Sequence, residues 1–168
     1  MLFLSAIIAS IYGAIHNQIS YSFSPEYFTK FKFLQFKIPW AIDNPRVGAA
    51  YVGALASWWM GALICMILGI FGYRFETTKD MSSYLLKSFT IVLFVAFLTG
   101  VIGLTYSYYH VNEQTISTYA FLVRSGVTDQ IQFVRVGFMH DAGYLGGALG
   151  LLFGILYLVF SKERLMKA

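Results

Sequence analysis

The chain has 168 residues, of which 58% are hydrophobic and only 12% are charged. Soluble domains carry about 25% charged residues, so this composition excludes an ordinary soluble protein. The net charge of +4 does not indicate a nucleic-acid partner, because the basic residues are scattered and form no long run. Cys65 is the only cysteine, which excludes an intrachain disulfide and a cysteine-based metal site.

Four apolar segments are each long enough to cross a bilayer, which takes about 20 helical residues. We expect the spans at residues 2–23, 47–73, 85–109 and 138–160. The first segment lacks a basic start and a good cleavage pattern, so we expect it to remain as a helix. Because the segments are apolar on every side, the sequence predicts an all-α, membrane-spanning four-helix bundle that forms a single domain, residues 1–168.

Four spans place both termini on one side of the membrane, together with the short loop 74–87. The 12 lysines and arginines divide equally between the two sides, but those near the termini lie in much shorter segments. The tail from Lys162 to Lys167 also follows directly after a helix end. The positive-inside rule therefore predicts that both termini are cytoplasmic.

The two longer loops carry helix signals of their own. Ser24, Pro25 and Glu26 are typical of a helix start, with Ser24 as the N-cap. Residues 27–37 mix aromatic rings with lysines, which indicates an interfacial amphipathic segment with its rings at the lipid boundary. In the second loop, residues 117–124 predict a short helix, and Thr128 is the expected N-cap of the last helix, which would then begin well outside the membrane.

Small residues recur every fourth position on two of the predicted helices. Such rows let helix backbones approach closely in lipid, so we expect them to be packing contacts. The alternative is that a flat cofactor rests against one of the rows. The rows are Gly53, Ser57 and Gly61 on the second helix and Gly146, Gly150 and Gly154 on the fourth, with Gly143 and Gly147 beside the latter.

The only three histidines lie at helix ends that should share one membrane face. His16 ends the first apolar segment, His110 ends the third and His140 precedes the fourth. Histidine with carboxylates is a ligand set for zinc, iron or manganese, and two histidines from different helices can hold a haem iron. The sequence therefore predicts a metal or haem site at the outer face, formed by His16, His110, His140, Glu26, Glu113 and Asp141.

Each of these residues also has a structural explanation. Only 15 residues precede His16, so His16-Asn17-Gln18 lies within the membrane unless the helix is displaced toward the headgroups. His110 follows several tyrosines and fits an aromatic belt at the interface. Asp141 fits a structural pair with an arginine. No metal, nucleotide or hydrolase motif is present, so the sequence leaves open whether the protein is an enzyme.

The first helix and its exit resemble a group of uncharacterised bacterial four-helix membrane proteins. The shared pattern reads Y-G-x-x-H-D-Q and then E-Y-F-T, and it matches this chain at His16, Gln18, Glu26 and Tyr27. Asn17 departs from the pattern, which has an aspartate at that position. The resemblance implies a bacterial membrane protein and implies no activity.

Two hypotheses follow from these observations. In the first, the protein lies in the lipid bilayer and binds a divalent metal or haem through its histidines. In the second, it is a non-catalytic accessory subunit that docks onto a membrane protein partner or a second copy of itself through its glycine rows and aromatic loops. Convergence of the predicted ligands in space distinguishes the two, because metal ligands must reach a common point to within about 2.0–2.2 Å.

Overall fold

Four long helices form the chain in the computed structural model, which describes residues 1–166, with side chains described up to Lys162. They are α1 (Leu2–Phe23), α4 (Pro45–Gly72), α5 (Thr78–His110) and α6 (Gln130–Met166). Shorter elements fill the two longer loops: α2 (Pro25–Tyr27), a π-helical turn (Phe28–Lys32), α3 (Phe33–Gln35) and 3-10 helices at Pro39–Ile42 and Ile116–Leu122. The residues described include no strand, and the all-α prediction is confirmed.

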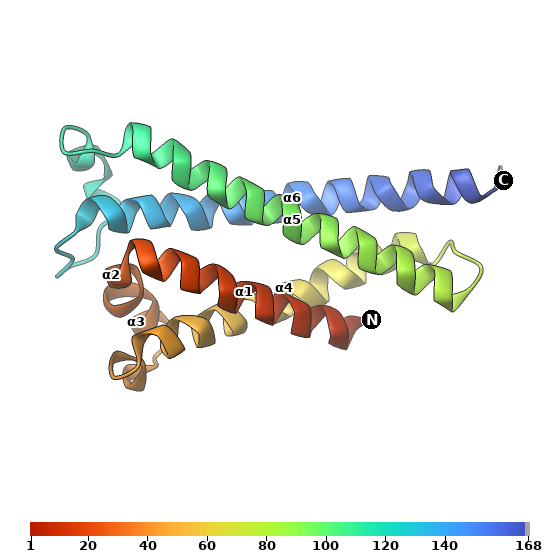
Figure 1. Cartoon of the computed structure of the whole chain (residues 1–168), viewed down its shortest axis with the longest axis horizontal. Helices are drawn as coiled ribbons and strands as arrows, with labels where there is room; N and C mark the ends of the chain where they lie inside the picture. The colour runs from red at the N-terminus through yellow and green to blue at the C-terminus, as the bar shows by residue number, and fades with distance from the viewer. Residues whose placement is uncertain (167–168) are drawn as a thin grey trace.

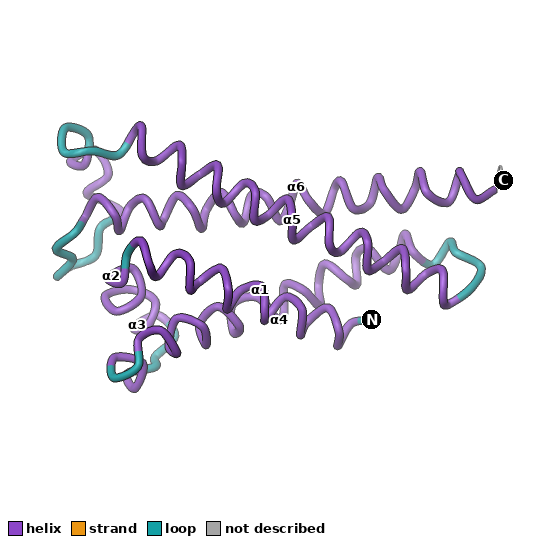
Figure 2. The backbone as a smooth tube through the Cα atoms, viewed as in Figure 1, coloured by secondary structure: helices purple, strands orange, loops and turns teal. Residues whose placement is uncertain are grey.

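The four helices pack as two pairs, α1 with α4 and α5 with α6 (Figure 1). Contacts between the pairs are much sparser than contacts within them. Both longer loops lie at one end of the bundle, here called the loop end (Figure 2). The N-terminus, the α4–α5 turn and the end of α6 lie at the opposite end, here called the terminal end. This arrangement confirms that the helices alternate in direction. The basic tail discussed above ends at Lys167, which lies outside the described residues.

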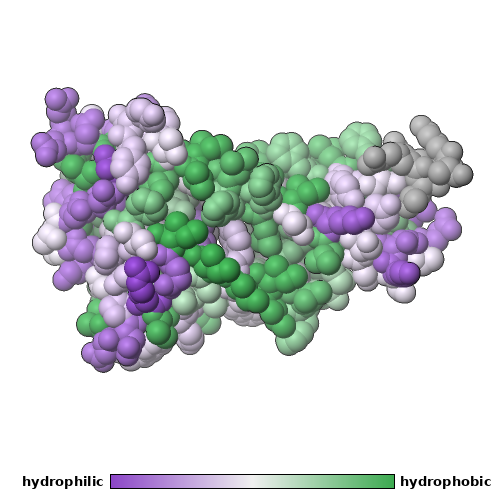
Figure 3. All heavy atoms as spheres, viewed as in Figure 1, coloured by the Kyte–Doolittle hydropathy of each residue, from purple (hydrophilic) through white to green (hydrophobic). Residues whose placement is uncertain are grey.

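All four long helices are long and apolar enough to cross a membrane. A hydrophobic band covers the middle of the molecule, and hydrophilic side chains gather at its two ends (Figure 3). Large apolar side chains such as Phe3, Ile70 and Phe94 are exposed on the outside of the bundle. Lipid is the solvent that such a surface fits, so the fold supports a membrane protein.

Glycines and serines set the close approach within each pair. A Cβ on Gly53 would overlap the backbone of Gly13 on α1, and a Cβ on Gly61 would overlap Ala9. On α6, Gly150 faces the Val92 backbone of α5 in the same way. The predicted packing function is therefore confirmed for the row that includes Gly53 and Gly61 and for the row of Gly146, Gly150 and Gly154.

The first long loop folds back into the protein. Tyr27, Phe28 and Phe33 are buried, and they join Val111 and Phe133 in one hydrophobic cluster. The predicted helix start is confirmed, because Ser24 accepts a hydrogen bond from the Tyr27 backbone. However, these three rings point into the protein and not toward lipid, because the cluster offers them an apolar surface on α6 and the second loop.

The last helix begins earlier than its apolar segment, at Gln130. Its cap is Asp129, whose carboxylate accepts a hydrogen bond from the backbone N–H of Gln132 at 3.0 Å. Thr128, the predicted cap, instead binds Glu26 of the first loop. The prediction of this cap was wrong by one residue, whereas the early start of the helix is confirmed.

Candidate functional site

Two of the three histidines meet inside the bundle. Helix α1 carries His16 and helix α6 carries His140, so the contact joins the two helix pairs. Their ring centroids lie 5.0 Å apart in an edge-to-face arrangement. Both are buried, with 8% and 9% of their surface exposed. Two polar rings at this depth of an apolar bundle are uncommon and are typical of functional positions.

His140 is held by neighbours on two sides. Its ring stacks on Tyr27, with centroids 5.0 Å apart and an interplanar angle of 16°. Its Nε2 lies 3.3 Å from the hydroxyl oxygen of Ser20 on α1. The first loop thus covers His140 from the loop end and fixes the orientation of its ring.

No described residue bonds to the Nε2 atom of His16, although that atom is fully buried. It faces α5 at Gly100, where an added Cβ would lie 3.5 Å from it. Tyr12, one turn earlier, is the nearest ring on the same helix, with centroids 5.9 Å apart. A buried polar atom without a partner costs about 1–3 kcal/mol, and native proteins usually satisfy such atoms with a ligand or water.

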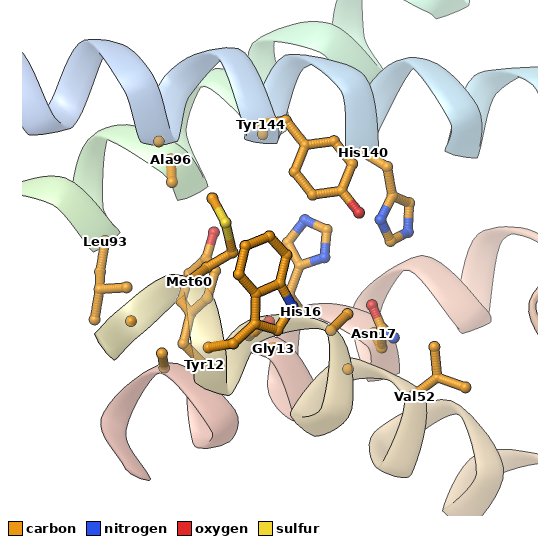
Figure 4. A pocket seen from close by; sticks show the side chains of 18 of the residues that line it. Tyr12, Gly13, His16, Asn17, Val52, Met60, Leu93, Ala96, His140 and Tyr144 are labelled. Atoms are coloured by element: carbon orange, nitrogen blue, oxygen red, sulfur yellow. The ribbon is translucent and has the colours of Figure 1, made fainter. Parts of the chain in front are cut away.

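His16 lines a cavity of about 550 Å³ between the two helix pairs. This volume lies in the range of small-molecule sites, about 300–1,000 Å³. His16, His140 and Tyr144 point toward one another in this cavity (Figure 4). Tyr144 and Trp59 line it and are also exposed on the outside of the bundle, so the cavity opens toward lipid.

The cavity is polar at one end and apolar at the other. On α4 its lining extends from Val52 to Ile64, which corresponds to about 18 Å along the helix axis. The polar lining lies toward the loop end and includes Asn17, Lys32, Gln35, His16, His140 and Tyr144. The lining toward the terminal end is apolar and includes Ala9, Ile64, Phe89 and Leu93. This gradient fits an elongated molecule with one polar end.

Lys32 enters the cavity wall from the first loop. Its Nζ donates a hydrogen bond to Gln35 Oε1 at 3.1 Å and lies 4.5 Å from the ring centroid of Phe31. Burial lowers the pKa of Lys32, and the charge of Asp141 opposes this shift. The side chain is thus a half-buried cation with a neutral hydrogen-bond partner.

Two glycines of α6 line the cavity and make no close contact with another helix. Gly143 and Gly147 both line it. A Cβ on Gly147 would meet no atom within 4 Å, and a Cβ on Gly143 would meet only a backbone oxygen at 3.8 Å. The row beside Gly146 and Gly150 therefore keeps space open next to the histidines.

The polar residues after His16 attach α1 to the start of α4. Asn17 is buried and donates a hydrogen bond from Nδ2 to the Ala49 carbonyl at 3.0 Å. Gln18 donates to the Arg46 carbonyl at 2.8 Å. Of the two explanations for this polar triplet, the structure supports placement inside the bundle for His16 and Asn17.

Glu26 lies away from the two histidines. Its carboxylate accepts hydrogen bonds from the backbone N–H of Asp129 at 2.8 Å and from the backbone and hydroxyl of Thr128. The Asp129 N–H is the largest cause of its lowered pKa, and the Thr128 donors and the charge of Lys30 add to it. Glu26 therefore ties the first loop to the start of α6.

His110 also lies apart from the pair. It is exposed on α5, its ring stacks on Tyr106 with centroids 3.8 Å apart, and its Nδ1 lies 2.9 Å from the Tyr106 carbonyl oxygen. Glu113 and Asp141 are exposed as well. Within the described part of the chain, no three His, Cys, Asp or Glu side chains are grouped as a metal site. Metal or haem binding by the six predicted residues thus stays a prediction.

The chain was compared with protein families, curated proteins and solved structures. No protein-family model matches the chain, and no curated protein or solved structure matches it either. The resemblance based on the first helix therefore stays a prediction, and the function has to be argued from the site.

Sequence reasoning identified His16 and His140 but missed most of the cavity around them. It placed Lys32 at the lipid interface and Tyr27 among rings facing lipid. The one signal for the cavity was the second glycine row, Gly143 and Gly147, which lies beside the packing row and opposite no bulky partner.

Proposed function

We propose that this protein binds a small amphipathic molecule within the membrane, in the cavity between its two helix pairs. The polar end of the ligand bonds to His16 and His140, and its apolar part extends toward Phe89 and Leu93. The observation that carries the proposal is the buried pair of His16 and His140 in the wall of a cavity of about 550 Å³, with no hydrogen-bond partner at His16 Nε2 among the described residues. A neutral imidazole can donate or accept a hydrogen bond, so it suits a hydroxyl, carbonyl or carboxyl group.

The membrane that we propose is a bacterial inner membrane, with both termini in the cytoplasm. The denser basic residues near the terminal end support this orientation. The polar end of the cavity then lies in the outer half of the bilayer. A ligand would enter sideways from lipid, past Tyr144 and Trp59, which are both exposed at the cavity wall.

Binding of radiolabelled hexadecanol, hexadecanoate and hexadecyl phosphate to the protein in lipid nanodiscs tests this proposal. We expect saturable binding of at least one probe at one molecule per chain, above the level of empty nanodiscs. Gly147→Leu should weaken that binding by about tenfold or more, because Gly147 lines the cavity and an added Cβ there meets no atom within 4 Å.

Gly69→Leu is the matched control. Gly69 also has open space around it, but it lies on α4 outside the cavity lining. We expect this variant to bind each probe as the unmodified protein does. No saturable binding of any probe, or equal binding by the Gly147→Leu variant, overturns the proposal.

A metal ion held by the two histidines is the second candidate. Imidazole nitrogens are common ligands of zinc, iron and other transition metals, and His16 has a free Nε2 beside His140. Haem is a further proposal for the same pair. Elemental analysis and an optical spectrum of protein purified without chelator or a histidine tag test both, and stoichiometric metal or a Soret band would support them.

A protein partner remains a prediction of the sequence. The exposed apolar side chains on the helices match a lipid environment, and lipid alone can cover them. The accessory-subunit hypothesis is therefore tested separately, by measuring whether the purified protein is a monomer, a homo-oligomer or part of a larger complex.

A further inference from the structure

The polar end of the cavity carries a positive charge. Lys32 lines the cavity, and Arg124 of the second long loop lies close by. Both cations sit on the same ring, because Lys32 Nζ lies 4.5 Å and Arg124 Cζ 4.8 Å from the centroid of Phe31. The two long loops thus converge on one aromatic ring beside the polar end of the cavity.

No carboxylate among the described side chains forms an ion pair with Lys32. Among the described side chains, the ion pair present is that of Lys162 with Glu76, at the terminal end. Glu26 is engaged by the backbone of Thr128 and Asp129. Asp141 influences the charge on Lys32 without reaching ion-pair distance. A half-buried cation at the polar end of the cavity, with Gln35 as its hydrogen-bond partner among the described residues, is suited to an anionic group from outside the chain.

We propose that the ligand is an anionic single-chain amphiphile, with a carboxylate or phosphate headgroup bound by Lys32. This inference rests on the proposed function, because it names the class of molecule that occupies the same cavity. The headgroup lies among Lys32, Gln35 and the histidine pair, and the hydrocarbon chain runs toward Phe89 and Leu93. The lining of about 18 Å along α4 gives space for an extended chain.

The three probes named above also test this inference, since they share one hydrocarbon chain and differ in headgroup. We expect hexadecanoate or hexadecyl phosphate to bind about tenfold or more tightly than hexadecanol, the effect of one charge-assisted hydrogen bond. The tighter of the two anions identifies the headgroup as a carboxylate or a phosphate. Equal affinity for all three probes would overturn the inference of an anionic headgroup but not the proposed amphiphile site.

Variants of Lys32 separate a specific contact from general attraction to the charged loop. Lys32→Gln should remove the preference for the anion, measured as the ratio of the affinities for the anionic probe and for hexadecanol. Lys32→Arg, which keeps the charge and the ring contact, should retain the preference. Lys30→Gln is the control, because Lys30 is exposed on the same segment and does not line the cavity. An equal loss in the Lys30→Gln and Lys32→Gln variants overturns the inference.

Discussion

The ring of Tyr27 stacks on the imidazole of His140, with centroids 5.0 Å apart and planes tilted by only 16°. This contact joins the first long loop to α6 and covers the histidine pair from the loop end. Tyr27 is buried, with 6% of its surface exposed, and also contacts Phe28, Phe31 and Phe133. The Tyr27 side chain therefore connects the first long loop to His140 in the polar wall of the cavity.

Replacing Tyr27 tests this link. Tyr27→Ala should lower the free energy of unfolding by about 3 kcal/mol, because a buried aromatic side chain is removed. It should also speed amide hydrogen exchange in residues 25–35, measured by mass spectrometry in detergent. Tyr27→Phe keeps the ring and should behave like the unmodified protein.

Tyr109→Ala is the control for that comparison, since Tyr109 is 78% exposed. Its melting temperature should stay close to that of the unmodified protein. If Tyr109→Ala speeds amide hydrogen exchange in residues 25–35 as much as Tyr27→Ala does, the stack with His140 does not hold the loop.

Local signals in the sequence were sufficient for most of the fold. Hydropathy predicted the four helices, Ser24 and Pro25 predicted the start of α2, and the spacing of Gly53 and Gly150 predicted close helix contacts. Each of these features depends on residues a few positions apart. His16 lies in the bundle interior, which is one of the two placements that the sequence left open for the polar triplet.

The cavity could not be predicted, because it depends on which sides of the helices face each other. A helix in a soluble protein shows its inner side as an apolar stripe, whereas a helix surrounded by lipid is apolar on every side. The sequence therefore grouped His110 with His16 and His140 by depth alone. Lys32 looked like an interfacial residue for the same reason, since nothing local shows that its loop folds back over the cavity.

The contact between Glu26 and the start of α6 predicts a dependence of stability on pH. Bonds from Asp129 and Thr128 lower the pKa of Glu26 below its ordinary value of 4.5 in the folded state. A lowered pKa means that the contribution is present above pH 4.5 and is lost as the pH falls through the folded-state pKa. Glu26→Gln should thus destabilise the protein at pH 7, by about 1 kcal/mol as for a helix cap.

Melting temperatures between pH 7 and pH 3 check this expectation. The difference between the unmodified protein and Glu26→Gln should shrink as the pH falls below 4.5, because Glu26 is protonated first in the unfolded state and, below its lowered folded-state pKa, in the folded state as well. Glu113→Gln, at an exposed carboxylate, should change little across the range. A difference that stays constant with pH would rule out the charged form of Glu26 as the stabilising group.

The contact of Gly53 with α1 predicts a large effect for a small substitution. A Cβ at this position would overlap the Gly13 carbonyl and lie 2.8 Å from the Ala14 backbone nitrogen, so α1 and α4 would have to separate. Gly53→Ala should therefore cost about 2 kcal/mol of stability, as overpacking does. Gly69→Ala lies in open space and should be neutral or slightly stabilising, since alanine favours helix. Thermal unfolding in detergent measures both, and equal melting temperatures would contradict the contact.

The placement of His110 gives the last prediction, which concerns metal binding. His16 faces Gly100 on α5, and His110 lies ten residues further along that helix, a distance of about 15 Å. Zinc ligands must come within about 2.1 Å of one ion, so His110 cannot share an ion with His16 in this arrangement. We expect His16→Ala and His140→Ala to weaken zinc binding by about tenfold or more, and His110→Ala to leave it unchanged.

Titration of zinc into chelator-treated protein, followed by calorimetry, measures these affinities. Haem binding is compared by recording an optical spectrum of each of the three histidine variants, purified without chelator. The contact of His110 with Tyr106 occupies its Nδ1 and holds its ring on the outside of α5. His110→Ala should therefore leave the zinc affinity unchanged. Equal losses in all three variants would instead favour a site in which the three histidines converge, and would require α5 to move relative to the other helices.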